Sequence, residues 1–114
     1  MPEFEYAGIQ MNNPVELALH VMGGKWKMPI LWRLQDRTYR YSELRRSLKR
    51  VTDRVLTKQL RELEADGLIQ RTVHPVVPPH VDYDITELGR TAIPAIETLR
   101  RWGDQYLEAV EASE

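Results

Sequence analysis

The sequence predicts a mainly α-helical (α+β) fold in a single domain. Hydrophobic residues make up 42% and charged residues 29% of the 114 residues, which is typical of a globular chain with one core. Apolar residues recur at helical spacing through most of the chain, whereas only the segments 68–74 and 80–85 alternate in the manner of strands. No apolar run approaches the roughly 20 residues of a membrane-spanning helix, and the acidic N-terminus does not resemble a secretory signal. We therefore expect a cytoplasmic protein with no membrane partner.

The first predicted elements are an arm and two helices. Residues 1–12 show no period, and we expect a flexible arm before one domain at 13–114. Asn13 followed by Pro14 is typical of a helix N-terminus, and the glycine pair at 23–24 ends this helix. A second helix is predicted over 25–35, and a short extended stretch is predicted at 38–41.

Two further helices are predicted to lie close together in the middle of the chain. Ser42 caps a short helix, and Thr52 caps a longer one that ends at Asp66, with Gly67 just beyond its C-terminus. About four residues separate the two helices, which is the arrangement of a helix-turn-helix.

A hairpin and a long helix complete the predicted domain. The two alternating segments form a hairpin about a proline-containing loop at 75–79. Thr86 caps a last helix at about 87–112. A hairpin that directly follows a helix-turn-helix is a wing, so the predicted fold is a winged helix-turn-helix with a small β-wing and a long C-terminal dimerisation helix.

Positive charge is concentrated in the helix-turn-helix. The whole chain has 16 basic and 17 acidic residues and a net charge of −1. From Arg33 to Arg61, however, ten basic residues accompany only three acidic ones, which gives this segment a charge of +7. Such asymmetry suits a protein that binds the phosphates of double-stranded DNA with one face and stays soluble elsewhere. Scattered ion pairs on a solvated surface are the alternative interpretation.

The helix that follows Thr52 has two opposed faces. Three leucines spaced i, i+4 and i+7 form the core face, and a cationic row has the same spacing two positions earlier, roughly 200° around the helix. The leucines are Leu56, Leu60 and Leu63, and the cations are Arg54, Lys58 and Arg61. The N-terminal residues of a recognition helix reach base edges in the major groove. The residues that we predict to read bases are Thr52, Asp53, Arg54, Thr57 and Lys58.

Contacts to the DNA backbone are predicted for both helices and the wing. The N-terminus of the helix that Ser42 caps offers backbone N–H groups to a phosphate. Basic side chains add positioning contacts that carry no sequence information. The predicted backbone contacts are Ser42, Arg45, Arg46, Arg61, Arg71, His74 and His80, of which Arg71 and the two histidines belong to the wing.

Several strings in the chain match one family of regulators. They are Pro14-Val15-Glu16, Gly23-Gly24-Lys25-Trp26, Tyr41-Ser42-Glu43-Leu44-Arg45-Arg46, Leu56-Thr57, Leu60, Glu62-Leu63, Gly67-Leu68-Ile69, Arg71, Pro75, Pro78-Pro79, Val81, Tyr83, Thr86 and Gly89. Together they resemble the HxlR-type regulators, bacterial winged helix-turn-helix proteins related to the MarR group. The resemblance implies a homodimer that binds pseudo-palindromic operators and represses or activates neighbouring genes. Of these two, we expect a repressor.

The chain departs from this family at two places. Many members carry a cysteine just before the Pro-Val-Glu string, where this chain has Asn13 and no cysteine anywhere. Cysteine-based sensing therefore does not carry over. The wing tip, which is often charged in the family, here has valines and prolines between His74 and His80. Contacts of this wing to phosphate are accordingly weak or depend on histidine protonation.

The predicted last helix carries more apolar surface than one small domain can cover. Its apolar residues recur at intervals of three and four, which favours an isologous dimer. The predicted interface residues are Leu88, Ala92, Ile96, Leu99, Trp102, Tyr106 and Val110. A helix that packs within its own subunit is the alternative.

Other chemistry finds less support in the sequence. No nucleophile elbow or glycine-rich phosphate loop is present, so we expect neither an enzyme nor a cofactor. His74 and His80 with Asp82 or Asp84 could bind a metal ion, but no standard zinc spacing appears and no metal site is predicted.

Two other functions remain as alternatives to a regulator that needs no ligand. The first is a regulator with a small-molecule effector in a dimer cleft lined by aromatic residues, which are Trp26, Trp32, Trp102 and Tyr106. Core and interface packing explains these aromatics more simply. The second is a dimerising interaction module without DNA binding.

Overall fold

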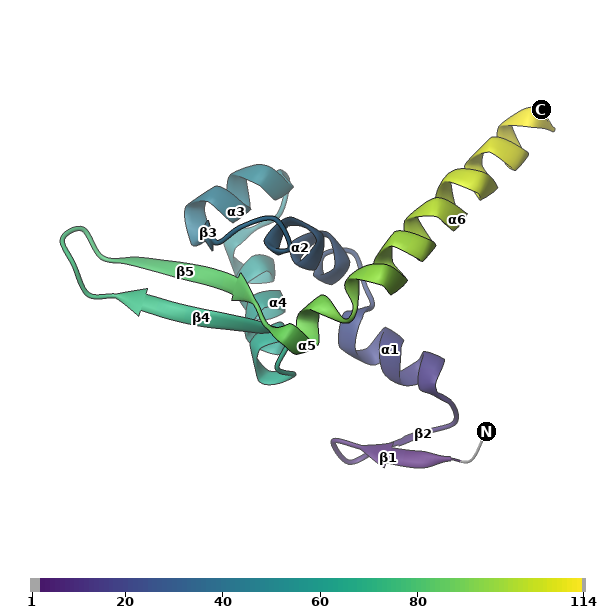
Figure 1. The fold of residues 1–114 in the computed structure, drawn as a ribbon, viewed down its shortest axis with the longest axis horizontal. Helices are drawn as coiled ribbons and strands as arrows, with labels where there is room; N and C mark the ends of the chain where they lie inside the picture. Colours follow the sequence, from purple (N-terminus) through teal and green to yellow (C-terminus); the bar gives the residue numbers. More distant parts are fainter. Residues whose placement is uncertain (1–2, 114) are drawn as a thin grey trace.

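The chain forms six helices and five strands over residues 3–113, the part that the computed structural model describes (Figure 1). The helices are α1 (Pro14–Met22), α2 (Lys27–Leu34), α3 (Tyr41–Leu48), α4 (Asp53–Ala65), α5 (Glu87–Arg90) and α6 (Ile93–Ala112). The strands are β1 (Phe4–Tyr6), β2 (Ile9–Met11), β3 (Tyr39–Arg40), β4 (Ile69–His74) and β5 (His80–Ile85). The predicted winged helix-turn-helix is confirmed, with α3 and α4 as the helix pair and β4–β5 as the wing.

The hydrophobic core lies where α2, α3 and α4 pack against the wing sheet. Leu56, Leu60 and Leu63 are at most 1% exposed, which confirms the predicted core face of α4. Around them are the buried side chains of α2, α3 and the two wing strands, including Ile30, Leu44 and Ile85. This core fixes the orientation of α4 and thereby of its opposite, cationic face.

The wing belongs to a three-stranded antiparallel sheet of order β3-β5-β4. In its register Tyr39 lies opposite Tyr83, and His74 lies opposite His80 at the end of the hairpin. The extended stretch predicted before Tyr41 is therefore a strand that pairs with the wing. This pairing holds the start of α3 against the sheet.

Three of the predicted helix caps are confirmed. The side chain of Asn13 accepts hydrogen bonds from two backbone N–H groups of α1, and the hydroxyl oxygen of Thr52 accepts one from Val55. The hydroxyl oxygen of Thr86 accepts a hydrogen bond from the backbone of Gly89. These bonds satisfy donors that the first turn of a helix leaves without partners.

The cap predicted at Ser42 is wrong. Helix α3 begins at Tyr41, because β3 runs directly into it and Arg40 is its last extended residue. The Glu43 carboxylate accepts the backbone N–H of Arg40 at 2.9 Å and so stabilises this end of the helix. Ser42 consequently lies within the first turn of α3, with an exposed side chain.

The prediction of an irregular N-terminal arm is also wrong for most of its length. Strands β1 and β2 pair as a hairpin whose turn residues, Ala7 and Gly8, both have positive φ. The Tyr6 hydroxyl donates a hydrogen bond to Asp66 at the end of α4, which ties this hairpin to the domain. Met11, the last residue of β2, is 1% exposed. Strands of three residues are too short to produce a recognisable alternation in the sequence.

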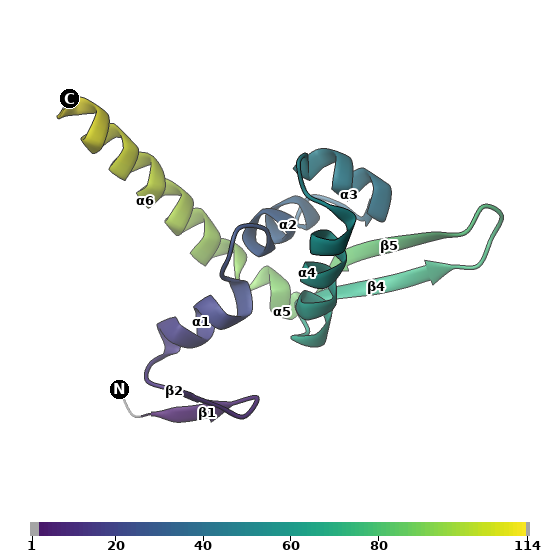
Figure 2. The same cartoon turned by 180° about the vertical axis from the view of Figure 1, so that it is seen from behind.

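The predicted last helix is divided into α5 and α6. Thr91 and Ala92 separate the two, and Pro94 in the first turn of α6 has no N–H to donate to the carbonyl four residues earlier. Helix α6 then extends away from the body on a different side from the wing (Figure 2). Its projection accounts for the radius of gyration of 16.4 Å, compared with about 13 Å for a compact chain of this length. None of the helices over residues 3–113 is long and apolar enough to cross a membrane.

Candidate nucleic-acid interface

The turn between α3 and α4 presents two cations. Lys49 and Arg50 both adopt positive φ, 53° and 47°, and both are exposed. Each such conformation costs a non-glycine residue about 1–3 kcal/mol, so the packing of α3 against α4 must hold the turn in place. The sequence pattern did not single out these residues, although their place between two helices in the +7 segment was a usable signal.

The outward face of α4 carries positive charge without ion-pair partners within residues 3–113. Arg54, Lys58 and Arg61 are exposed, and none forms a salt bridge there. Of the acidic residues near this face, Glu62 pairs with Lys27 at 3.5 Å and Asp66 accepts from a tyrosine. Glu64 lines a hollow beside Arg61 but forms no salt bridge over residues 3–113. The cationic face is therefore available to an anionic ligand.

Asp53 connects the two helices of the helix-turn-helix. Its Oδ1 atom accepts the Tyr41 hydroxyl hydrogen bond at 2.6 Å and lies 3.1 Å from Nε of Arg45. Burial, followed by the hydrogen bond to Asp53, raises the pKa of Tyr41 above its ordinary value of 10.0, so the phenol remains a donor at neutral pH. Among the predicted base readers, Asp53 thus differs from Arg54 and Lys58, because its carboxylate holds α3 against the start of α4.

A hollow of about 510 Å³ lies at the helix-turn-helix turn. It brings together the predicted backbone contacts Ser42, Arg45 and Arg46 with the cations of the turn. Its lining residues are Tyr41, Ser42, Arg45, Arg46, Lys49, Arg50, Val51, Thr52 and Asp53. Because the N-terminus of α4 borders the same hollow, four basic side chains and the positive end of a helix dipole surround it. This combination suits a phosphate group.

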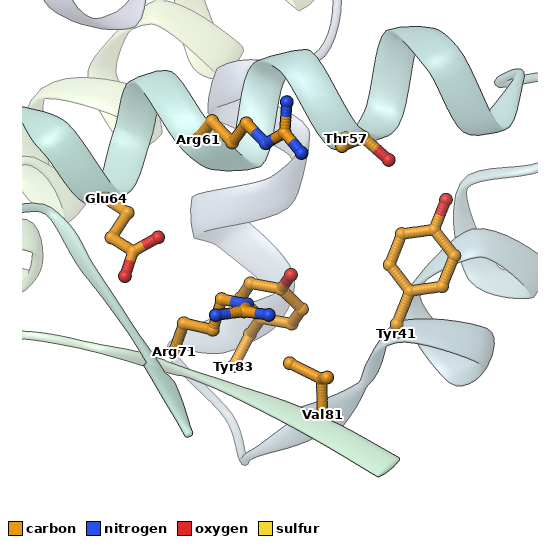
Figure 3. Close-up of a pocket in the computed structure, with 7 residues that line it drawn as sticks. All are labelled: Tyr41, Thr57, Arg61, Glu64, Arg71, Val81 and Tyr83. Carbon is orange, nitrogen blue, oxygen red and sulfur yellow. The ribbon is translucent and has the colours of Figure 1, made fainter. Parts of the chain in front are cut away.

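A second hollow, of about 310 Å³, separates α4 from the wing (Figure 3). Arg61 of α4 and Arg71 of β4 both line it, together with Tyr83 on the neighbouring strand. Burial raises the pKa of Tyr83 above its ordinary value of 10.0, against the opposing effect of nearby Arg71, so this hydroxyl stays neutral at physiological pH. Arg61 and Arg71, which are both predicted to contact the DNA backbone, therefore face the same hollow from two different elements.

The wing histidines are not part of this group. Side chains alternate along a strand, so His74, His80 and Asp82 lie on the face of the sheet opposite to Arg71 and Tyr83. Nε2 of His74 lies 2.8 Å from Oδ2 of Asp82. The tip of the wing beyond them exposes valines, of which Val77 is 99% exposed.

The residues predicted for the dimer interface have two different environments. Trp102 is 61% exposed, and Leu88, Leu99, Tyr106 and Val110 are exposed as well. Ile96 is 6% exposed and belongs to the core of its own subunit, with Ala92 packed beside it, so the placement of Ile96 in the interface is wrong. Pattern alone missed this because Ile96 lies in the first turn of α6, where the helix still contacts the body.

Three exposed apolar residues on α1 and α6 are not among the predicted interface residues. They are Leu107 on α6 and Val15 and Leu19 on α1. From Thr98 to Ser113 every residue is exposed, although the side chains of Trp102 and Tyr106 stack on each other with ring centroids 5.4 Å apart. In proteins most of the stability of a helix comes from tertiary packing of its apolar face rather than from helix propensity.

Comparison with known proteins assigns the family. The model of HxlR-like helix-turn-helix proteins matches residues 21–111. The chain belongs to the HxlR family. An HTH-type transcriptional regulator of Bacillus subtilis, YdeP, is 46% identical over 101 residues, which cover 89% of this chain and 79% of YdeP. A regulator of the same type from Methanothermobacter thermautotrophicus is 48% identical over 106 residues, covering 89% of this chain and 81% of the relative. The chain is therefore a DNA-binding regulator of the helix-turn-helix type.

Solved structures agree with the fold. The redox regulator HypR in its reduced form has a TM-score of 0.81 and 44% identity, covering 88% of this chain and 99% of HypR. A MarR-family regulator from Porphyromonas gingivalis has a TM-score of 0.75 and 33% identity, covering 79% of this chain and 88% of the relative. HypR is a redox regulator. This chain contains no cysteine, so it has no thiol that could be oxidised.

Proposed function

We propose that this HxlR-family protein is a homodimeric transcriptional repressor that binds a pseudo-palindromic operator. The observation that carries the proposal is the exposed cationic face of α4, which is without ion pairs in residues 3–113 and lies beside the basic helix-turn-helix turn. A helix with its core face buried and its outward face cationic is suited to enter a major groove.

The DNA contacts divide into two groups. Arg54, Thr57 and Lys58 read base edges, with the Thr52 hydroxyl beside them at the start of α4. Asp53 positions α3 and Arg45 by the contacts described above. Contacts to phosphates come from the two hollows, through the turn cations and through Arg61 with Arg71. Such backbone contacts set the register of the protein on the duplex and carry no sequence information.

The second copy covers the apolar face of α6. Continuous exposure from Thr98 to Ser113 argues for a partner along this length, and the exposed Val15 and Leu19 of α1 extend the apolar surface. A two-fold axis through these helices presents two α4 helices to DNA, and half-sites about 34 Å apart match one turn of the duplex.

Binding to a labelled duplex from upstream of the protein's own gene tests the proposal. The titration runs from low to physiological salt, with competitor DNA present, because specificity is a ratio of affinities. We expect tight binding that resists competitor and falls steeply with salt, since each phosphate contact releases counterions. A failure to bind any duplex at low salt would contradict the proposal and favour a dimerising interaction module instead.

An effector site is a second candidate, favoured by a hollow beside the dimer helix. Trp32 on α2 lines this space of about 390 Å³ together with Leu99 of α6. The four aromatic residues predicted for such a cleft are not brought together, because Trp102 and Tyr106 lie further along α6 and do not line it. A screen of aromatic metabolites followed by tryptophan fluorescence tests this site. A ligand that quenches the wild type but not Trp32→Phe, and that lowers operator affinity, would support it.

A further inference from the structure

The outer face of the wing gathers two imidazoles and a carboxylate. His74 ends β4 and His80 begins β5, and the hairpin register sets them opposite each other. Their rings stack with centroids 4.6 Å apart. Asp82 lies two residues further along β5, on the same face, with Oδ2 2.8 Å from Nε2 of His74 and Oδ1 3.8 Å from Nε2 of His80.

These three groups offer the donors that divalent transition metals prefer. One ligand atom from each residue lies within 4.8 Å of the other two. Tetrahedral zinc holds nitrogen and oxygen ligands at about 2.0 Å, which places neighbouring ligand atoms roughly 3.3 Å apart. Side-chain rotations that change these separations by up to about 1.5 Å would therefore complete a three-ligand site. Two histidines and one carboxylate form a known zinc ligand set in which water takes the fourth position.

The site is accessible to an ion from solvent. The side chains of His74, His80 and Asp82 are 40%, 25% and 20% exposed, so each is anchored by the sheet yet reachable. Asp84, the other carboxylate considered in the sequence, hydrogen-bonds to Thr38 and lies outside the group. Five residues separate the two histidines, a spacing that zinc fingers combine with a pair of cysteines, and this chain has no cysteine. The hairpin register is what brings Asp82 beside the two histidines.

We propose that His74, His80 and Asp82 form a binding site for a divalent transition-metal ion, with Zn²⁺ as the ion that fits. The metal joins β4 to β5 next to the 75–79 loop and replaces the close contact between His74 and Asp82. Because it links the two strands of the wing in the folded state only, metal binding stabilises the hairpin.

The test uses the full chain without an affinity tag, freed of metal by chelation and dialysed. Calorimetric titration with ZnCl₂ at neutral pH measures stoichiometry and affinity, and imidazole ¹H–¹⁵N spectra identify the ligands. We expect one Zn²⁺ per chain, with shifts of the His74 and His80 nitrogens and a higher melting temperature. The variants His74→Ala and Asp82→Asn should each weaken binding by about tenfold or more, because one of three ligands is lost.

His20 supplies the matched control. The chain has three histidines, and His20 is the one outside the proposed site. It lies on α1, where its ring packs against the ring of Tyr6. His20→Ala should bind Zn²⁺ like the wild type. The proposal is overturned if Zn²⁺ does not bind saturably, if His20→Ala abolishes binding, or if folded His74→Ala and Asp82→Asn retain wild-type affinity. Circular dichroism of each variant confirms that the fold is intact, and His80→Gln provides a second ligand variant should one of the others fail to fold.

Discussion

Replacing Trp102 with alanine should weaken the proposed homodimer by several hundredfold. Trp102 lies near the middle of the exposed part of α6 and is 61% exposed in the single chain. Its stacking on Tyr106 leaves most of the indole for a partner. In an isologous dimer each substitution acts twice, once in each copy.

The magnitude follows from the exposed area. A tryptophan side chain offers roughly 250 Å², so an exposed fraction of 61% corresponds to about 150 Å². If the partner covers half of this, the two copies together remove about 150 Å² from water, worth about 4 kcal/mol at 25 cal/mol per Å². An energy of about 4 kcal/mol raises the dissociation constant about 500-fold.

Sedimentation equilibrium over a range of protein concentrations measures this change. Val77→Ala is the control, because Val77 is an exposed apolar residue at the wing tip, away from α6. Its dissociation constant should match the wild type. A wild-type chain that sediments as a monomer, or a folded Trp102→Ala chain with an unchanged dimer constant, would refute the assignment of α6 to the interface.

Three other outcomes are expected. Arg54→Ala should cost about 1–3 kcal/mol of operator affinity and relax the preference at one base pair. Arg61→Ala should instead weaken binding to all sequences alike. Equal losses of affinity for Arg54→Ala across a set of operator variants would exclude base reading by Arg54. Gly89→Ala should lower the free energy of unfolding by about 1–3 kcal/mol, because the added Cβ would lie 2.2 Å from the carbonyl oxygen of Leu68, and a urea midpoint equal to the wild type would contradict this. The backbone N–H of Arg40 holds the pKa of Glu43 below its ordinary value of 4.5, so its contribution to stability is present above that value and is lost as the pH falls through the folded-state pKa. Urea unfolding should therefore show a larger loss of stability on acidification for the wild type than for Glu43→Gln, and parallel pH profiles would argue against the cap.

Local patterns were sufficient where one element carries its own signal. The core face of α4 follows from three leucines at helical spacing, and the caps at Asn13, Thr52 and Thr86 follow from side chains that bond within one turn of their own helix. Both the periodicity and the capping act over a few residues. The sequence alone could therefore predict them without knowledge of distant contacts.

Errors arose where a neighbouring element decides the outcome. The start of α3 moved from Ser42 to Tyr41 because β3 pairs with the wing, and Ile96 left the predicted interface because α6 begins against the core. The N-terminal hairpin is tied down by the hydrogen bond from Tyr6 to Asp66, a residue far along the chain. None of these contacts leaves a periodic trace in the sequence.

The sequence by itself determined the order of the elements from Pro14 to Ile85, the concentration of positive charge between Arg33 and Arg61, and the family motifs. Only the tertiary structure decided how the charged groups are grouped. In the folded chain Arg61 and Arg71 line the same hollow. Asp53 contacts Tyr41 and Arg45. The physical reason is that side-chain partners depend on strand register and helix packing, and these are fixed by the burial of the core as a whole.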